Sequence, residues 1–390
     1  MEMAKEAMER EFDEIMGRIG GEFASESGFR NARNYLIGLM GPTERKNGWQ
    51  LSEALGERSP YKIQQFLYRG EYSADGLRDR LREYVAEKLG DPDGVMVVDD
   101  SGFLKQGTMS CGVARQYTGT AGKVCNCQIG VFLSYAGPKG YCPIDRGLYM
   151  PEAWAVDAGR LAKAGAPEGL EFRTKPEIGL SMVQAATAAG MPYRWVTGDC
   201  AYGDHGGLRE WLEANGRSYV LGVSWKADIG GSNVGAQLLG LPEDGWFEAS
   251  CGDGSKGAKV YDWQVREFAT GPVAPGFRRV LLARRGGSDR ETKAFIAYAP
   301  VGTPDAKMAE VAGTRWTVES CFKESKGEVG LDHYEVRTYD GWHKHVTFAL
   351  LAIAMLTVLS ANSGDGLSLQ QHDPAGSSLD DFKKKPCLLA

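Results

Sequence analysis

A short run of apolar residues, positions 95–98, is followed at once by two acids, Asp99 and Asp100. An unbroken apolar run, without polar alternation, is typical of a strand in the middle of a sheet that is covered on both faces. The run therefore predicts a central strand that ends at Asp99, where a Gly-containing turn begins. A strand end of this kind is a common ligand position in α/β proteins.

A second acid repeats this arrangement. Residues 193–197 predict another strand, and Asp199 follows it after Gly198. An isolated aspartate at a strand end is commonly a turn or cap residue, which is the alternative for both positions. The recurrence of the pattern favours a function for Asp99 and Asp199 together.

A third acid lies on a predicted helix. Arg315, Glu319, Phe322 and Lys326 follow each other at spacings of four, three and four residues, so they share one face of the helix, which Gly327 is expected to cap. The alternative is a solvated stripe whose ion pairs contribute only ~0.3 to 0.5 kcal/mol each. The two aspartates favour the functional interpretation.

Three carboxylates that converge on one point repel each other, so a cation has to hold them together. Asp99, Asp199 and Glu319 offer hard oxygen ligands without His or Cys, which favours two Mg²⁺ or Mn²⁺ ions. Two ions ~3.5 to 4 Å apart support phosphodiester displacement. Arg315 and Lys326 would then hold phosphates beside them. The pattern predicts DNA strand cleavage or strand transfer.

Bulk composition restricts the other possibilities. The chain has 390 residues, a formal net charge of −6 and a pI near 5.6, so any DNA-binding surface has to be local. Its eight cysteines, without a secretory signal, predict reduced thiols in the cytoplasm. The apolar run 346–359 is shorter than the ~20 residues that a membrane span needs, so we expect a buried helix and no membrane association.

The order of the predicted elements gives an α/β fold class with an N-terminal helical domain and a β-rich insertion. Helical spacing extends to about residue 90, strands and helices then alternate, and Gly-rich turns separate strands at 259–268, 277–284 and 293–298. The predicted segments are a helical, possibly DNA-binding domain at 1–90, a catalytic core in two parts at 91–225 and 303–362, the insertion at 226–302, and a flexible tail at 363–390.

Three basic features suggest further DNA contacts. The apolar spacing at 51–55 and 63–67 fits a helix-turn-helix or an ordinary helix pair, and nearby cations keep DNA contact possible. Lys344 lies between His343 and His345, where a DNA-facing or capping role is favoured over metal ligation. The predicted hairpin in the insertion carries a basic patch, whose alternative is a solvated edge, made of Arg278, Arg279, Arg284, Arg285 and Arg290.

Several motifs together resemble those of the DDE transposases of insertion sequences, which have a ribonuclease-H-like core. The similar stretches lie between about 30 and 360 and are 97–105, 126–131, 197–204, 315–319 and 326–335. The chain most resembles the insertion-sequence family numbered seven hundred and one, a relative of family four. Arg315, Glu319 and Lys326 match the last three positions of the Tyr-Arg-Glu-Lys signature of family four, whereas Ala312 occupies the tyrosine position.

The resemblance implies a ribonuclease-H-like mixed sheet and a transposase that binds terminal inverted repeats and target DNA as a homodimer in the bacterial cytoplasm, associated with the nucleoid. It favours Asp99 over Asp100 as the first catalytic acid. The DNA-binding residues that we predict are Arg315, Lys326, Lys105, Arg284, Arg285 and Lys344. Two alternatives are a domesticated transposase that only binds DNA, and a glycoside hydrolase, which the cationic stripe does not support.

Overall fold

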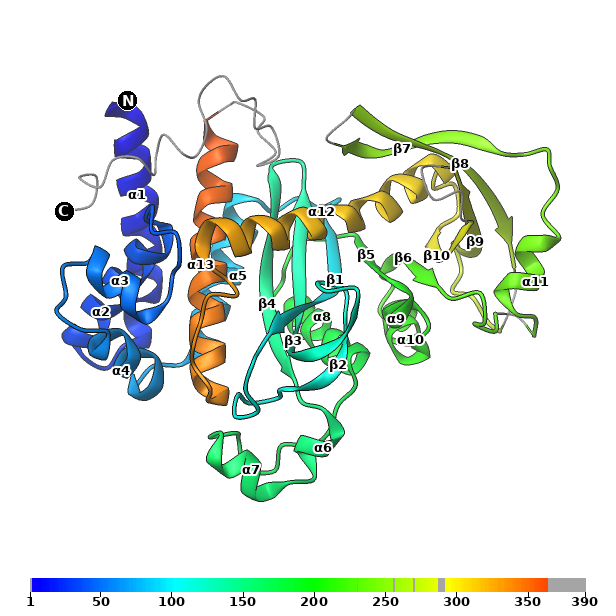
Figure 1. Cartoon of the computed structure of the whole chain (residues 1–390). Coiled ribbons are helices and arrows are strands. Elements are labelled where there is room, and N and C mark those ends of the chain that lie inside the picture. Colours follow the sequence, from blue (N-terminus) through cyan, green and yellow to red (C-terminus); the bar gives the residue numbers. More distant parts are fainter. Residues whose placement is uncertain (1, 230, 255–256, 269–270, 287–291, 364–390) are drawn as a thin grey trace.

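One mixed β-sheet runs through most of the molecule, with helices packed against it (Figure 1). The computed structural model describes residues 2–229, 231–254, 257–268, 271–286 and 292–363, so the predicted tail from 364 onward lies outside the described residues. The sheet contains β1 (Val95–Leu104), β2 (Ala114–Thr118), β3 (Lys123–Gly137), β4 (Gly140–Tyr149), β5 (Trp195–Gly198), β6 (Ser218–Val223), β7 (Phe247–Gly254), β8 (Gly257–Glu267), β9 (Phe277–Arg285) and β10 (Lys293–Pro300).

The helices include a short 3-10 turn, η1 (Gly20–Glu22), and two long C-terminal helices. They are α1 (Glu2–Ile19), α2 (Glu26–Met40), α3 (Gly48–Ala54), α4 (Tyr61–Arg69), α5 (Ala74–Lys88), α6 (Glu152–Ala155), α7 (Ala158–Lys163), α8 (Lys175–Ala188), α9 (Cys200–Gly203), α10 (Gly206–Ala214), α11 (Val234–Leu239), α12 (Asp305–Val329) and α13 (Tyr339–Asn362).

The centre of the sheet has a ribonuclease-H-like topology. Strands β1, β3 and β4 form an antiparallel meander, and β5 and β6 continue the sheet parallel to β1 on its other side. Strands β5 and β6 are buried along their whole length, and β1 is buried from Val95 to Val98, which agrees with the mostly apolar sequences of these segments. The predicted α/β class and ribonuclease-H-like mixed sheet are therefore confirmed.

Strand β1 continues beyond the point where the sequence predicted its end. It pairs with β3 through Leu104, so residues 101–102 lie within the strand and not in a turn. Tertiary pairing prevails here over the turn preference of the Asp-Asp-Ser-Gly sequence. Gly102 is required at this point, because a Cβ atom there would clash with the side chain of Thr118.

Residues 226–302 extend the same sheet. The three predicted strands are present as β8, β9 and β10, while the strand β7 and the short helix α11 were not predicted. Antiparallel pairing of β10 with β6 joins these strands to the central ones. The sheet is continuous across this junction, so the boundaries of the predicted segments remain a prediction.

Helices α1 to α5 gather beside α13 (Figure 1), which confirms the predicted helical character of the first 90 residues. Among the described residues, α13 is the one helix long and apolar enough to cross a membrane, and 78% of its most apolar window is buried inside the protein. The predicted buried helix over 346–359 is thus part of α13, which packs against β4 and the N-terminal helices.

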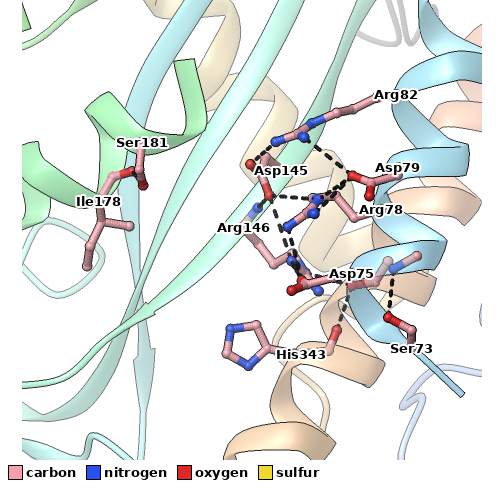
Figure 2. Close-up of polar contacts among 12 residues, drawn as sticks. Ser73, Asp75, Arg78, Asp79, Arg82, Asp145, Arg146, Ile178, Ser181 and His343 are labelled. Atoms are coloured by element: carbon pink, nitrogen blue, oxygen red, sulfur yellow. Dashed lines mark hydrogen bonds and ion pairs between the residues drawn. The ribbon is translucent and has the colours of Figure 1, made fainter. Parts of the chain in front are cut away.

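A buried cluster of ion pairs connects α5 to β4, as Figure 2 shows. The carboxylate of Asp145 on β4 accepts a hydrogen bond from Arg82 on α5, and both side chains are 4% exposed. Arg146 Nη1 donates to Asp75 on α5 at 2.9 Å, and its Nε donates to Thr347 on α13 at 2.7 Å. The cluster fixes the N-terminal helices to the edge of the sheet.

Candidate active site

Asp99 and Asp199 occupy corresponding positions on two neighbouring parallel strands. Val98 of β1 pairs with Gly198 of β5, and each aspartate is the next residue along the chain. Asp199 also caps α9, because its side chain accepts a hydrogen bond from the backbone N–H of Ala201 at 2.9 Å. The turn or cap role considered for these acids therefore holds for Asp199, in addition to its place beside Asp99.

Glu319 reaches this edge of the sheet from α12, which crosses the sheet in front of β1 (Figure 1). Arg315, one turn earlier, joins the two elements. Its Nη1 lies 3.7 Å from Asp99 Oδ2, and its Nη2 donates to Glu319 Oε1 at 3.3 Å. Residues 99 and 319 are thereby brought to one place by a shared cation.

The environment of Asp99 favours its neutral form. Burial raises the pKa of this carboxyl to about 7, the charge of Asp199 adds to the rise, and Arg315 opposes it. The side chain of Asp99 is 15% exposed, whereas that of Glu319 is 62% exposed. Arg315 therefore does not fully offset burial and the charge of Asp199, and a further cation beside Asp99 would favour its charged form.

Asp100 faces the opposite side of the sheet, as strand alternation requires. Its carboxylate accepts a hydrogen bond from Lys175 of α8 at 3.0 Å. Burial raises the pKa of Asp100, and Lys175 opposes the rise. This pairing supports Asp99 over Asp100 as the acid that faces α12. Lys175 was not predicted, although the Thr174-x-x-Glu177 capping box marks the start of its helix.

The three acids are suited to Mg²⁺ or Mn²⁺ by their chemistry, since all of their donor atoms are hard oxygens. In the part of the chain that the structure describes, no three His, Cys, Asp or Glu side chains are close enough together to hold a metal ion. Arg315 occupies the space between Asp99 and Glu319, and the exposed Glu319 side chain can change rotamer. Closure around an ion would require that change.

Two of the predicted DNA-binding lysines lie further along the same face. Lys326 Nζ is 3.4 Å from both Gly102 O and Thr120 Oγ1, and burial lowers the pKa of this lysine. Lys105 Nζ lies 3.6 Å from the centre of the Tyr334 ring, and burial lowers its pKa to about 8. Both lysines are half-buried and directed toward protein groups. Their contact with DNA stays a prediction.

The predicted roles of Lys344 and its two neighbours are wrong. Lys344 is 2% exposed; its Nζ donates to Gly70 O at 2.5 Å and pairs with Asp340 at 2.6 Å. His343 and His345 are buried in the same helix, and burial lowers the pKa of each to about 3. These side chains belong to the core, because α13 is surrounded by protein.

The basic patch predicted in the insertion is not a free positive surface. Arg284 is 3% exposed, with its guanidinium over the rings of Tyr261 and Trp316 at 4.3 and 4.8 Å. The prediction that Arg284 binds DNA is therefore wrong. Arg285 is 37% exposed and is paired with Glu243 and Asp262, which weakens its predicted role.

Two other arginines of the patch are also paired with acidic side chains. Arg278 pairs with Asp305 and Glu267, and Arg279 pairs with Glu213. Arg290 lies outside the described residues.

The predicted cap at Gly327 is also wrong: α12 continues to Val329, and Gly330 ends it in the left-handed conformation with φ 66°.

A ribonuclease-H-like sheet that carries two aspartates and then a helical glutamate defines the DDE class of nucleic-acid-processing enzymes. Residues 22–228 match the family described as DDE superfamily endonuclease, and residues 183–355 match the transposase DDE domain. The first match spans more than half of the chain, so the chain belongs to the DDE superfamily endonucleases. The prediction of a DDE transposase of the insertion-sequence type is confirmed.

Two individual proteins are similar to this chain. A probable transposase for insertion sequence element IS701 from Microchaete diplosiphon is 24% identical over 316 residues, which cover 79% of this chain and 77% of the relative. A cryo-EM structure of the piggyBac transposase synaptic complex with hairpin DNA is 11% identical, with a TM-score of 0.46. The match covers 93% of this chain and 72% of that chain.

Proposed function

We propose that this transposase binds the terminal inverted repeats of its element as a homodimer, cuts one strand at each end and joins the freed ends to target DNA. The observation that supports the proposal is the arrangement of Asp99, Asp199 and Glu319 on two neighbouring strands and one helix. The first two are neighbours in strand register, and Arg315 contacts both Asp99 and Glu319. The IS701 relative supports the same activity.

Asp99, Asp199 and Glu319 would hold the divalent ions. Two Mg²⁺ or Mn²⁺ ions would activate the attacking oxygen and stabilise the leaving oxygen of the phosphodiester. Asp199 is already oriented by its hydrogen bond to Ala201 N, and Asp99 Oδ1 is held at 2.7 Å from Asp100 N. The second carboxylate oxygen of Asp199 would serve a ligand, and Oδ2 of Asp99 would do so once the Arg315 guanidinium, 3.7 Å away, moves off.

In this proposal Arg315 binds the two carboxylates in the free protein and a DNA phosphate in the complex. In the free protein its guanidinium balances part of the charge of Asp99 and Glu319. When cations bind the carboxylates, the guanidinium is released to bind a phosphate of the DNA, which it can contact through two parallel N–H donors. Arg315 therefore keeps the acids close before DNA arrives and orients the DNA afterwards.

The experiment uses a duplex that carries the element's end, which the DNA flanking the gene provides. Asp99→Asn, Asp199→Asn and Glu319→Gln should each reduce Mg²⁺-dependent strand cleavage to about 1% of wild type or less, by analogy with the loss of one electrostatic stabiliser. Binding of the duplex should persist. The matched control is Asp100→Asn, which changes the carboxylate on the opposite face and should retain cleavage. Wild-type cleavage by Asp99→Asn would refute the proposal.

A further inference from the structure

The hairpin formed by β2 and β3 lies beside the proposed active site, on the same face of the sheet. The register pairs Asp99 with Phe132 of β3, and Tyr117 of β2 with Val124 of β3. Because directly paired residues share a face and every second residue returns to it, Asp99, Tyr117 and Val124 all point to one side. Arg115, two residues before Tyr117, points there too.

The tip of this hairpin is fixed to both catalytic elements. Thr120 Oγ1 donates to Gly102 O of β1 at 3.2 Å, and Lys326 of α12 lies 3.4 Å from the same hydroxyl. Gly102 is three residues from Asp99 in a strand, and Lys326 is seven residues from Glu319 in a helix. Both separations correspond to roughly 10 Å, or about three nucleotides of a B-form strand.

The hairpin presents an unusual set of exposed side chains. Tyr117 is 62% exposed and its cross-strand neighbour Val124 is 54% exposed. An aromatic ring and an apolar side chain therefore lie side by side on the solvent-exposed surface. Arg115 is also exposed. Within the described part of the chain, no ion pair or hydrogen bond engages its guanidinium. The deeper part of this face is covered, because Phe132 packs on Phe322 of α12.

The charge of this segment differs from that of the whole chain. The protein has 51 acidic residues, yet the stretch 101–144, which contains the whole of β2 and β3, has no Asp or Glu. An anion that lies on the hairpin therefore meets no carboxylate from the hairpin itself. The exposed ring and the uncompensated guanidinium are the two groups that bind unpaired DNA, through base stacking and phosphate contact.

We propose that Arg115 and Tyr117 form a binding site for a single-stranded segment of DNA next to the scissile phosphate. This inference rests on the proposed function, because the strand is the one that continues from the active site. Tyr117 stacks on an unpaired base, with Val124 extending the apolar contact. Arg115 binds a phosphate one or two nucleotides away. The site thus holds a strand whose bases have separated near the cut.

The test measures binding of fluorescein-labelled dT20 and of a random 20-base-pair duplex by anisotropy, in EDTA and at several salt concentrations. Tyr117→Ala should weaken dT20 binding by about 5-fold or more and affect the duplex less, because stacking of one base contributes that much. Tyr117→Phe should bind like wild type. In a plot of the logarithm of the dT20 binding constant against the logarithm of the salt concentration, Arg115→Ala should make the negative slope shallower by ~0.7. This change corresponds to one lost phosphate contact.

Lys123→Ala is the matched control, because Lys123 is exposed on the same hairpin but its register with Thr118 places it on the opposite face. If Tyr117→Ala and Arg115→Ala bind dT20 as Lys123→Ala does, the inference is wrong. The proposed function would still stand if cleavage depended on Asp99, Asp199 and Glu319. If cleavage did not depend on them, the dT20 measurements would still decide whether the hairpin binds single strands.

Discussion

Arg315 Nη1 lies 3.7 Å from Asp99 Oδ2, so the helix that carries the third acid also supplies the cation for the first. The same guanidinium is 3.3 Å from Glu319 Oε1. The carboxylates of Asp99 on β1 and Glu319 on α12 are thereby held near each other before any metal ion is bound. Arg315 thus links two of the three predicted carboxylates in the free protein, and its removal should change the titration of Asp99.

Replacing Arg315 with Ala should move the acidic limb of the pH-rate profile to higher pH. Arg315 lowers the pKa of Asp99, which burial and Asp199 have raised to about 7, so its loss raises that pKa further. We expect a shift of roughly 1 pH unit in kcat/KM for Mg²⁺-dependent cleavage. Arg315→Lys keeps the charge and serves as the control. An unshifted acidic limb in Arg315→Ala would show that Arg315 does not act on Asp99.

Stability without metal should fall as the pH rises toward 7, because of Asp99. A carboxyl with a raised pKa binds its proton more tightly in the folded state than in the unfolded state, so stability decreases between pH 3.8 and about 7. The contribution is at most about 1.4 kcal/mol per pH unit. In urea denaturation at pH 5 and pH 8 with EDTA, Asp99→Asn should lose part of this dependence.

Mg²⁺ at pH 8 should then stabilise the wild type more than Asp99→Asn, since binding to the folded state alone raises stability. Glu168→Gln, which changes an exposed carboxylate on another part of the surface, is the control for both measurements. Equal pH dependence in the wild type and in Asp99→Asn would mean that Asp99 titrates normally in the folded protein.

Asp145→Asn should destabilise the protein by about 3 to 5 kcal/mol, because it removes the charged partner of the buried Arg82 and Arg146. The free energy of unfolding in urea measures this loss. Asp79→Asn changes a half-exposed acid that contacts Arg82 from the same helix, and should cost less than about 1 kcal/mol. Similar losses for both variants would contradict the role given to the buried cluster in Figure 2.

Lys344→Met should lower stability by about 1 to 3 kcal/mol and leave the salt dependence of DNA binding unchanged. The substitution removes a hydrogen bond to Gly70 O and an ion pair with Asp340, while its apolar chain fits the buried position. The free energy of unfolding tests the predicted loss of stability. The salt dependence of binding to the 20-base-pair duplex tests whether Lys344 contacts DNA. A shallower salt dependence without loss of stability would restore the DNA-binding role.

The sequence was informative about the strands of the core, because buried parallel strands are mostly apolar. The runs before Asp99 and Asp199 predicted two strands, and the parallel register of Val98 with Gly198 brings the two acids side by side. The continuation of β1 was not predictable locally. It depends on pairing with β3, and a Gly in the Asp-Asp-Ser-Gly stretch is usually a turn signal.

The basic residues were harder to interpret, because their partners are distant in sequence. Arg279 pairs with Glu213 on α10, and Arg285 pairs with Glu243, so a local count of positive charges overstated the patch. The long stretch without acids at 101–144 was visible in the sequence. Its meaning required the register that places Tyr117 and Asp99 on the same face.

The pairing of β10 with β6 has a mechanical consequence. A hinge between the insertion and the catalytic strands would have to break the ladder from Ala294 to Tyr298, which pairs with Val223 to Tyr219. The strands β7, β8 and β9 are therefore joined through β10 and β6 to β5, which Asp199 follows. DNA bound at the far end of the sheet would in this way act on the acids through one continuous ladder of strands, with no hinge between them.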